Sequence, residues 1–200
     1  FDGLLTNAFI SGSGAYVNSL ATGTAGTGTA LTSSGRGSIV EIDNMLQTMW
    51  DAYQVSPTVL YVNSQELKNM SNKILNAGSS AYLNYMVDAT AERGYSISAG
   101  GVISNYFNPF TTAADGGIKI PIKIHPNIPA GTILGYCEDL PAQYQSSEVP
   151  NIAEVKTRVD YYQMNWADTS RAKQVGVYSE QTLAVYLPQA IGVINNIANG

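Results

Sequence analysis

The sequence has few charged residues, one cysteine and one histidine, and each shortage excludes a class of protein. Charged residues occupy 12% of the 200 positions, which is half of the usual share of about a quarter. The single cysteine, Cys137, excludes an internal disulfide framework and a cysteine-based zinc site. Because His125 is the sole histidine, we expect no transition-metal site. No apolar run approaches the roughly 18 residues of a membrane-spanning helix, so the sequence predicts none.

Basic residues are scarce as well. The chain has 10 Lys and Arg against 15 Asp and Glu, a formal net charge of −5 and a pI near 4.7. This balance argues against a nucleic-acid-binding domain, which would need a basic face. Hydrophobic residues make up 44% of the chain, so wholesale disorder is excluded and a real core can form. We expect one domain of generous size or two smaller lobes.

Helical signals dominate the first half, after a low-complexity segment at 21–37 that predicts a loop. Apolar residues recur at helical spacing over 39–54, and Ser38 with Glu41 fits a capping box. A buried strand is predicted at 58–62, and a second helix begins after Asn63. A third helix is predicted over 79–93.

Strand signals dominate the second half. Isoleucines alternate with other residues over 118–124, and Pro121 favours an edge strand because it has no amide hydrogen to donate. Further strands are predicted at 132–136, from 155 to 162, and within the β-rich run 174–187.

We find no arrangement of residues typical of catalysis, so the sequence predicts neither an enzyme nor a cofactor. The glycines of GTAGTG at 23–28 lack the Lys-Ser/Thr of a phosphate-binding loop. Cys137 and His125 could in principle form a catalytic Cys/His pair. Glu138 and Asp139, however, would raise the pKa of the Cys137 thiol and so disfavour the reactive thiolate. We therefore interpret His125 as structural and Cys137 as inert.

Aromatic residues point instead to surfaces that meet other molecules. Thirteen of them are tyrosines, and Tyr161, Tyr162 and Trp166 form a cluster. Tyrosine and tryptophan are favoured at interfaces because one end is apolar and the other forms hydrogen bonds. The excess favours contacts with protein or with sugar.

The C-terminal segment carries a family resemblance. Residues 157–198 read TRVDYYQMNWADTSRAKQVGVYSEQTLAVYLPQAIGVINNIA, with the pattern E-x-x-L-A-V-x-x-P-x-A-I at its end. This segment resembles the C-terminal region of tailed-bacteriophage major capsid proteins. The helix, the strand SPTVLYVN and the following helix SQELKNMSNKIL resemble that family's middle part, and IPAGTILGYCEDLP resembles the strand pair after it.

The resemblance implies an α+β fold in two lobes, shared with encapsulin shell proteins. A peripheral lobe would comprise residues 1–57 and 141–187, with a spine helix at about 39–54. An axial lobe, a central sheet with flanking helices, would comprise 58–140 and 188–200. The chain begins at Phe1 without Met, and only about 38 residues precede the expected spine helix. We therefore expect a core fragment that lacks the family's N-terminal arm and most of its extended loop.

The resemblance also implies a function. The chain would be a structural subunit of an icosahedral phage or prophage capsid, forming pentamers and hexamers around double-stranded DNA. Its partners would be copies of itself and a scaffolding protein or maturation protease, with no membrane and no sequence-specific nucleic acid. It would be found in the virion, and in the host cytoplasm during assembly. The residues expected to serve assembly or packing are Tyr161, Tyr162, Trp166, Arg171 and Pro188. Two alternatives stay open: an encapsulin-type compartment shell, and a carbohydrate-binding or adhesion module.

Overall fold

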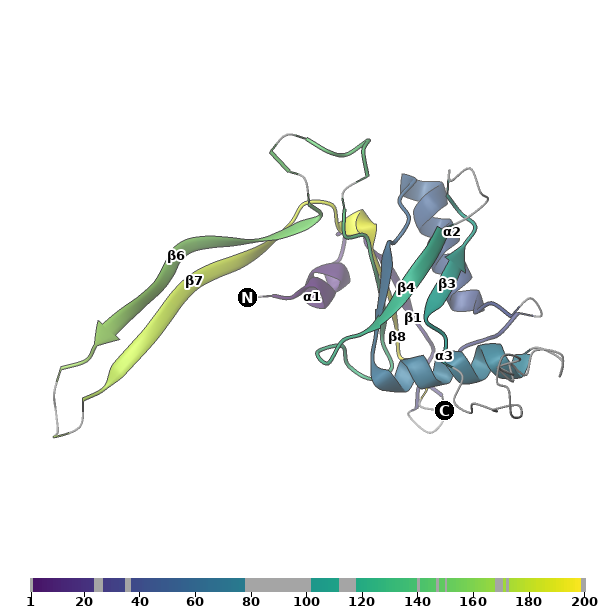
Figure 1. Cartoon of the computed structure of the whole chain (residues 1–200), viewed down its shortest axis with the longest axis horizontal. Helices are drawn as coiled ribbons and strands as arrows, with labels where there is room; N and C mark the ends of the chain where they lie inside the picture. Colours follow the sequence, from purple (N-terminus) through teal and green to yellow (C-terminus); the bar gives the residue numbers. More distant parts are fainter. Residues whose placement is uncertain are drawn as a thin grey trace, which may run out of the picture.

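The fold consists of a body and a long hairpin that projects from it (Figure 1). The computed structural model describes residues 2–23, 27–34, 37–77, 102–111, 118–139, 141–146, 148–149, 151–167, 171 and 173–198. The third helix predicted over 79–93 lies outside these residues. Among the described helices, none is both long enough and apolar enough to cross a membrane.

The elements follow one another in a mixed order of helices and strands, so the expected α+β class is confirmed. They are α1 (Leu4–Phe9), β1 (Tyr16–Ser19), α2 (Val40–Tyr53), β2 (Val59–Val62), α3 (Ser64–Ala77), β3 (Asn105–Asn108), β4 (Ile118–Ile124), β5 (Ile133–Tyr136), β6 (Ala153–Asn165), β7 (Val175–Val185), the short 3₁₀ helix η1 (Pro188–Ala190) and β8 (Ile191–Asn195).

The body is built on a mixed sheet of six described strands in the order β1-β8-β5-β2-β4-β3. The pairs β1–β8 and β2–β4 are parallel, and the other neighbours are antiparallel. β8 comes last in the chain but lies between β1 and β5. The sheet therefore joins the two ends of the chain.

Helix α2 covers one face of this sheet at close range. Met45 and Met49 of α2 lie directly over two glycines of the sheet. A Cβ on Gly192 would lie 2.6 Å from Sδ of Met45, and one on Gly135 would lie 2.9 Å from Cε of Met45. The packing favours glycine most strongly at Gly192, where two methionine side chains approach, whereas at Gly135 the nearest atom is the flexible end of Met45. The core between helix and sheet holds the buried side chains Ile42, Met45, Leu46, Met49, Leu60, Val62, Ile120, Ile133 and Ile194.

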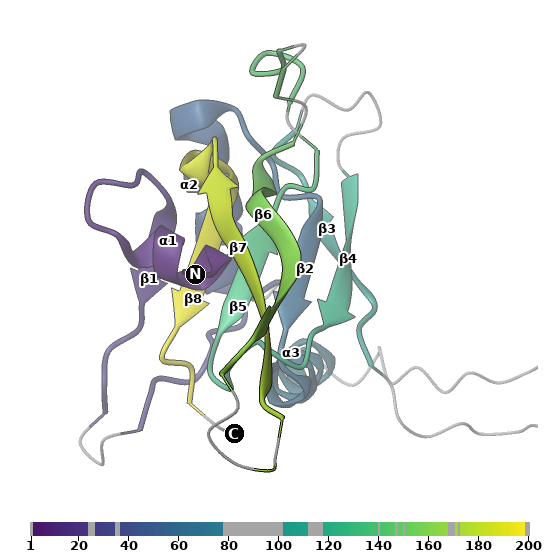
Figure 2. The same cartoon turned by 90° about the vertical axis from the view of Figure 1, so that its left-hand side faces the viewer.

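Helix α1 lies on the opposite face of the sheet. Ala8 packs there against Leu134, Ile191 and Val193 in a second, smaller cluster. Because α1 has only six residues, it covers part of this face, and the strands β2 and β4 extend beyond it (Figure 2).

The assignment of segments to two lobes stays a prediction, but the packing bears on where α2 belongs. We expected α2 to be the spine helix of a peripheral lobe. It buries Met45 and Leu46 in the same cluster as Leu60 and Ile133, which come from strands expected in the axial lobe. The part that stands apart from this core is the hairpin of β6 and β7 (Figure 1).

The capping box predicted at the start of α2 is wrong. The helix begins at Val40, one residue later than a cap at Ser38 would require, because Ile39 is fully buried and extended. The carboxylate of Glu41 accepts the backbone N–H of Thr32 at 3.0 and 3.1 Å. The Ser38 hydroxyl donates to Asp43 at 2.7 Å. Both side chains therefore tie the preceding loop to the helix.

The predicted start of α3 is confirmed. The side-chain oxygen of Asn63 accepts the backbone N–H of Gln65 at 3.0 Å, which satisfies one of the free amides of the first turn. Glu66 turns inward instead of back to the cap. It is fully buried and accepts the N–H of Gly131 at 3.0 Å.

The strand predicted at 118–124 is confirmed as β4, but its predicted edge position is wrong. β4 lies between β2 and β3. Ile122 donates its N–H to Ser104, so the ring nitrogen of Pro121 faces the β2 side. The pairing with β2 begins only at Ile122. Pro121 therefore fits inside the sheet: its nitrogen, which cannot donate a hydrogen bond, faces β2 at a point where β4 is not yet paired with β2.

Candidate assembly surface

The hairpin of β6 and β7 is the most exposed structure in the described part of the chain. The two strands pair only with each other, and Figure 1 shows the ribbon reaching well beyond the body. Twelve of the 13 residues of β6 are exposed. A two-stranded ribbon is marginally stable by itself in water. This hairpin therefore requires a further surface to cover it.

The sequence builds a bent ribbon because β6 holds two more residues than β7. The cross-strand register shifts between Thr157 and Val159, and again between Val159 and Tyr162. Each shift places an extra residue on β6, and such β-bulges bend a strand and increase its twist. Figure 1 shows the resulting curve along the hairpin. β7 is regular throughout, so its residue numbers define the two faces of the ribbon.

The two faces differ in charge. Side chains alternate along a strand, and cross-strand partners share a face. The odd-numbered residues of β7 and the β6 residues that pair with them are all uncharged, and we name the face that they form the charge-free face; Asp160 and Tyr161 lie within the second bulge, outside the paired positions. Its members are Ala153, Val155, Thr157, Gln163, Asn165, Val175, Val177, Ser179, Gln181, Leu183 and Val185. Val177 is 68% exposed, so apolar surface on this face is open to water.

The opposite face, which we name the charged face, has ion pairs and aromatic contacts. Lys156 lies 3.0 Å from Glu154, and Arg158 lies 3.2 Å from Glu180. The hydrogen bond from Lys156 holds the pKa of Glu154 below its ordinary value. Exposed pairs of this kind contribute little to stability. The hairpin segment as a whole is neutral, because residues 153–187 hold four basic and four acidic residues. The net charge of −5 therefore lies on the rest of the chain.

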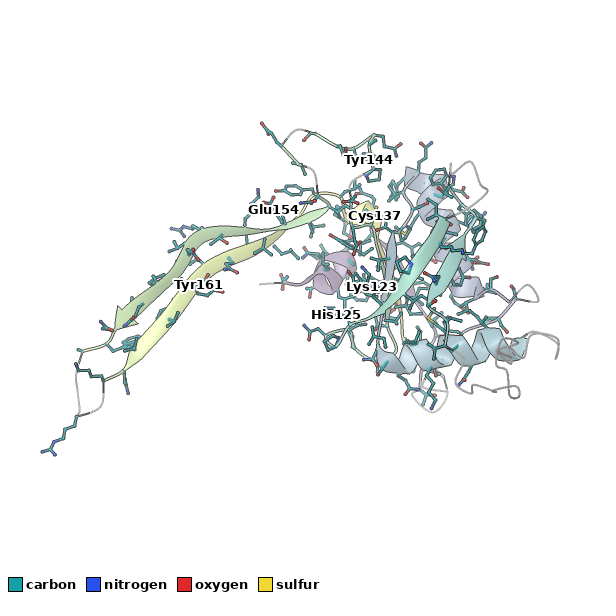
Figure 3. All side chains as sticks on the ribbon, viewed as in Figure 1. Lys123, His125, Cys137, Tyr144, Glu154 and Tyr161 are labelled. Atoms are coloured by element: carbon teal, nitrogen blue, oxygen red, sulfur yellow. The ribbon has the colours of Figure 1, made fainter. Side chains whose placement is uncertain are left out.

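Four of the five residues expected to serve assembly lie together on the outer half of the hairpin. Tyr161, which Figure 3 labels on the hairpin, is 73% exposed and lies next to the second bulge. Tyr162 stacks on Tyr178 with ring centres 5.7 Å apart. Trp166 directly follows β6, is 52% exposed and donates its backbone N–H to Gln174. Arg171 is exposed in the turn between the strands. The four side chains are thus exposed on one part of the hairpin, and their role in assembly stays a prediction.

Pro188 lies apart from this group. It begins η1 at the base of the hairpin, where the chain re-enters the sheet as β8. Its fixed backbone angle suits the first position of a helix. The structure therefore separates Pro188, which shapes the backbone, from the four exposed residues of the hairpin.

The charge-free face was missed by the sequence reasoning, which singled out aromatic residues. The signal was present: every odd-numbered residue from Val175 to Val185 is uncharged. At the base of the hairpin, Val185 packs against the cluster that contains Ala8 and Val193. The charge-free face is thus continuous with the side of the body that carries α1.

A hollow of about 420 Å³ lies on that side of the body, beside α1. Leu4, Leu5, Ile128 and Leu134 make it mostly apolar, and Tyr61 and His125 lie at it as well. The ring of His125 meets Tyr61 edge-on at 5.9 Å, and its Nδ1 accepts the N–H of Asn127. Such a hollow is suited to an apolar side chain.

A small polar group on the same side consists of Tyr61, Lys123 and Glu138, of which Figure 3 labels Lys123. Glu138 accepts a hydrogen bond from Tyr61 at 3.0 Å and pairs with Lys123 at 3.1 Å. The Lys123 hydrogen bond, and then that of Tyr61, lowers the pKa of Glu138. Both charges of this pair are therefore already engaged.

Cys137 and His125 lie in different surroundings. The thiol of Cys137 is buried with Val55, Ile152 and Ala190 and donates to the carbonyl of Asp139 at 2.9 Å. Burial, followed by the charge of Asp139, raises the pKa of the thiol to about 11. The direction agrees with the sequence analysis, but burial is the larger cause. Within the described residues, no three His, Cys, Asp or Glu side chains are grouped as metal ligands would be.

Comparisons with known proteins place these observations in context. The family model described as SU10 major capsid protein matches residues 2–198. Among solved structures, the chain is similar to a chain of the holo-SrpI encapsulin complex from Synechococcus elongatus PCC 7942, with 16% sequence identity and a TM-score of 0.38. That similarity covers 98% of this chain and 56% of the encapsulin chain, so this chain spans little more than half of its length. No curated protein sequence matches the chain.

Proposed function

Because this chain belongs to the SU10 major capsid protein family, we propose that it is the subunit of an icosahedral phage or prophage capsid. The resemblance seen in the sequence is confirmed at the level of the family, whose members are structural proteins of a viral shell. In our proposal, copies of the chain associate into pentamers and hexamers that enclose double-stranded DNA.

The observation that carries the proposal is the uncovered hairpin. The charge-free face exposes Val155, Val175 and Val177 to water along an isolated two-stranded ribbon. Large exposed apolar patches mark interaction sites. In a shell, every subunit meets others of its own kind, and contacts between identical copies close into rings. A neighbouring subunit would cover this ribbon.

The distribution of charge suits a container for DNA. The hairpin segment 153–187 is neutral, and the rest of the chain has a net charge of −5. DNA binds non-specifically where basic residues release its counterions. An acidic wall gives no such gain, so packed DNA would not adhere to it.

The remaining elements of the proposal are partners and location. The partners are copies of the chain itself, together with a scaffolding protein or a maturation protease during assembly. The subunit would assemble in the host cytoplasm and remain in the virion. Its role would be structural, without a cofactor.

Electron microscopy of the full-length protein tests the proposal. We expect closed particles, and we expect Trp166→Ala to reduce their number while the melting temperature stays unchanged. Phe107→Ala is the matched control, since Phe107 is 54% exposed but lies on the body. A full-length protein that stays monomeric at all concentrations and forms no particles would contradict the proposal.

The content of the particles separates a capsid from a compartment. Particles recovered from the native host are treated with nuclease and then opened. Protected double-stranded DNA supports a capsid. A protein cargo without DNA would instead identify an encapsulin-type compartment.

A further inference from the structure

Strand edges with free backbone groups are the places where another strand can add to a sheet. The described strands leave four such edges: β1 and β3 at the ends of the six-stranded sheet, and the outer edges of β6 and β7. β1 and β3 have four residues each. The two edges of the hairpin are much longer.

The edge of β6 is protected against pairing. Its two bulges interrupt the regular row of backbone groups, and Lys156 and Arg158 lie along it. Bulges and positive charges are devices by which proteins protect edge strands. β7 has 11 residues with no bulge. Its one charged residue, Glu180, is already paired with Arg158.

The hydrogen bonds at both ends of the hairpin show which groups of β7 are free to pair outward. Tyr186 donates its N–H to Ile152, and Gln174 accepts the N–H of Trp166. Even-numbered residues of β7 therefore face β6, because backbone groups alternate in an antiparallel pair. The odd-numbered residues from Val175 to Val185 direct their N–H and C=O groups to the outer edge.

We propose that the outer edge of β7 pairs with the same edge of β7 in a second copy of this chain, in antiparallel orientation. The inference rests on the proposed self-assembly. β1 and β3 are too short to match β7, and β6 is interrupted by bulges. The only described edge as long and as regular as that of β7 is therefore the same edge in a second copy of the chain. The pairing is self-complementary, as a two-fold contact requires. No unpaired like charges meet, because Arg158 accompanies each Glu180.

The pairing also resolves the instability of the isolated ribbon. Two hairpins joined along β7 form a four-stranded sheet, and three or more strands with an apolar face can be stable. Outward-facing partners share a face, so the two charge-free faces lie on the same side of the joined sheet. One side of that sheet is uncharged and the other is charged, which is the usual pattern of an antiparallel sheet with one covered side.

Two proline variants of the full chain test the pairing. Gln181 of β7 and Thr157 of β6 are cross-strand partners, and the N–H of each faces its own outer edge. Gln181→Pro removes an N–H from the proposed contact, and Thr157→Pro removes one from the other edge of the hairpin. Each substitution acts twice in a two-fold pair, so Gln181→Pro should raise the dissociation constant of the pair by about tenfold or more. Thr157→Pro should leave it within about twofold of the unsubstituted chain.

Hydrogen exchange of the unsubstituted chain gives a second readout that does not depend on any variant folding. On concentration, the amides of Val177, Ser179, Gln181 and Leu183 should slow by about tenfold or more, measured by mass spectrometry at single-residue resolution. The outward amides of Val155 and Thr157 should not change. Unchanged β7 amides, or equal slowing on both edges, would overturn the pairing. So would equal effects of the two proline substitutions.

The failure of this inference can be told from the failure of the proposed function. Closed particles with unprotected β7 amides would leave the shell role standing and remove the pairing. Protected β7 amides in a chain that forms only dimers would support the pairing and contradict the shell.

Discussion

Replacing Val177 with serine tests whether the charge-free face is buried on assembly. Complete burial of a valine side chain contributes about 1.5–3 kcal/mol. Val177 is 68% exposed in the single chain, so covering it would contribute about 1–2 kcal/mol per copy. Val177→Ser removes this gain, and the concentration required for assembly should rise by about 5- to 30-fold.

The control is the same substitution on the other face of the hairpin. Val159 lies opposite Glu180 on the charged face. Val159→Ser and Val177→Ser both replace valine, which favours strands, with serine, and this difference in strand propensity is at most about 1 kcal/mol. We expect Val159→Ser to change the stability of the hairpin but to leave the assembly concentration within about threefold.

Sedimentation velocity over a concentration series measures both variants, with far-UV circular dichroism to check that each is folded. Val155→Ser, on the charge-free face, should behave like Val177→Ser. Equal shifts for Val177→Ser and Val159→Ser would refute the reasoning, since the two faces would then be equivalent. An unchanged assembly concentration for Val177→Ser would refute it too.

Three further predictions concern the body. Tyr106→Phe removes the acceptor of the buried N–H of Ile39 (3.0 Å) and a 2.6 Å hydrogen bond to Asp43, so the free energy of unfolding should fall by about 1–3 kcal/mol in urea titrations. Gly192→Ala places a methyl group against Met45 and Met49 and should cost about 1–3 kcal/mol by the same measurement. Gly3→Ala meets nothing within 4 Å and should cost less than about 1 kcal/mol, through the weaker N-cap of α1 alone. Burial raises the pKa of Glu66 above its ordinary 4.5, so the folded state binds its proton more readily and stability should rise as the pH falls from the raised pKa toward about 4.5. Glu66→Gln should abolish that rise in melting temperature, and a rise of the same size in the variant would contradict this cause.

Elements with a clear period were predictable from the sequence. Helical spacing identified α2 and α3, alternation identified β4 and β6, and β-rich composition identified β7. α1 and β1 were not predicted, because their short segments LLTNAF and YVNS show neither a helical period nor the β-branched apolar run that identified β2. The parallel pairing of β1 with β8 joins residues more than 170 positions apart, and no local pattern encodes it.

The candidate surface was predictable in part. The aromatic cluster of Tyr161, Tyr162 and Trp166 was recognised, and all three lie on the hairpin. Alternation along a strand shows which residues share a face, but not whether another element covers that face. The capping box shows the same limit: Glu41 has the right spacing from Ser38, yet the carboxylate binds the loop at Thr32.

The position of β8 determines the order in which this chain can fold during synthesis. Among the described strands, β8 is the last to be made, and it enters the sheet between β1 and β5. Until residues 191–195 leave the ribosome, β1 has no partner among the described strands and β5 has only β2. The hairpin precedes β8 in the chain and pairs only with itself, so both of its strands are made before β8. A nascent chain therefore contains the whole contact surface before the strand that completes the six-stranded sheet is available.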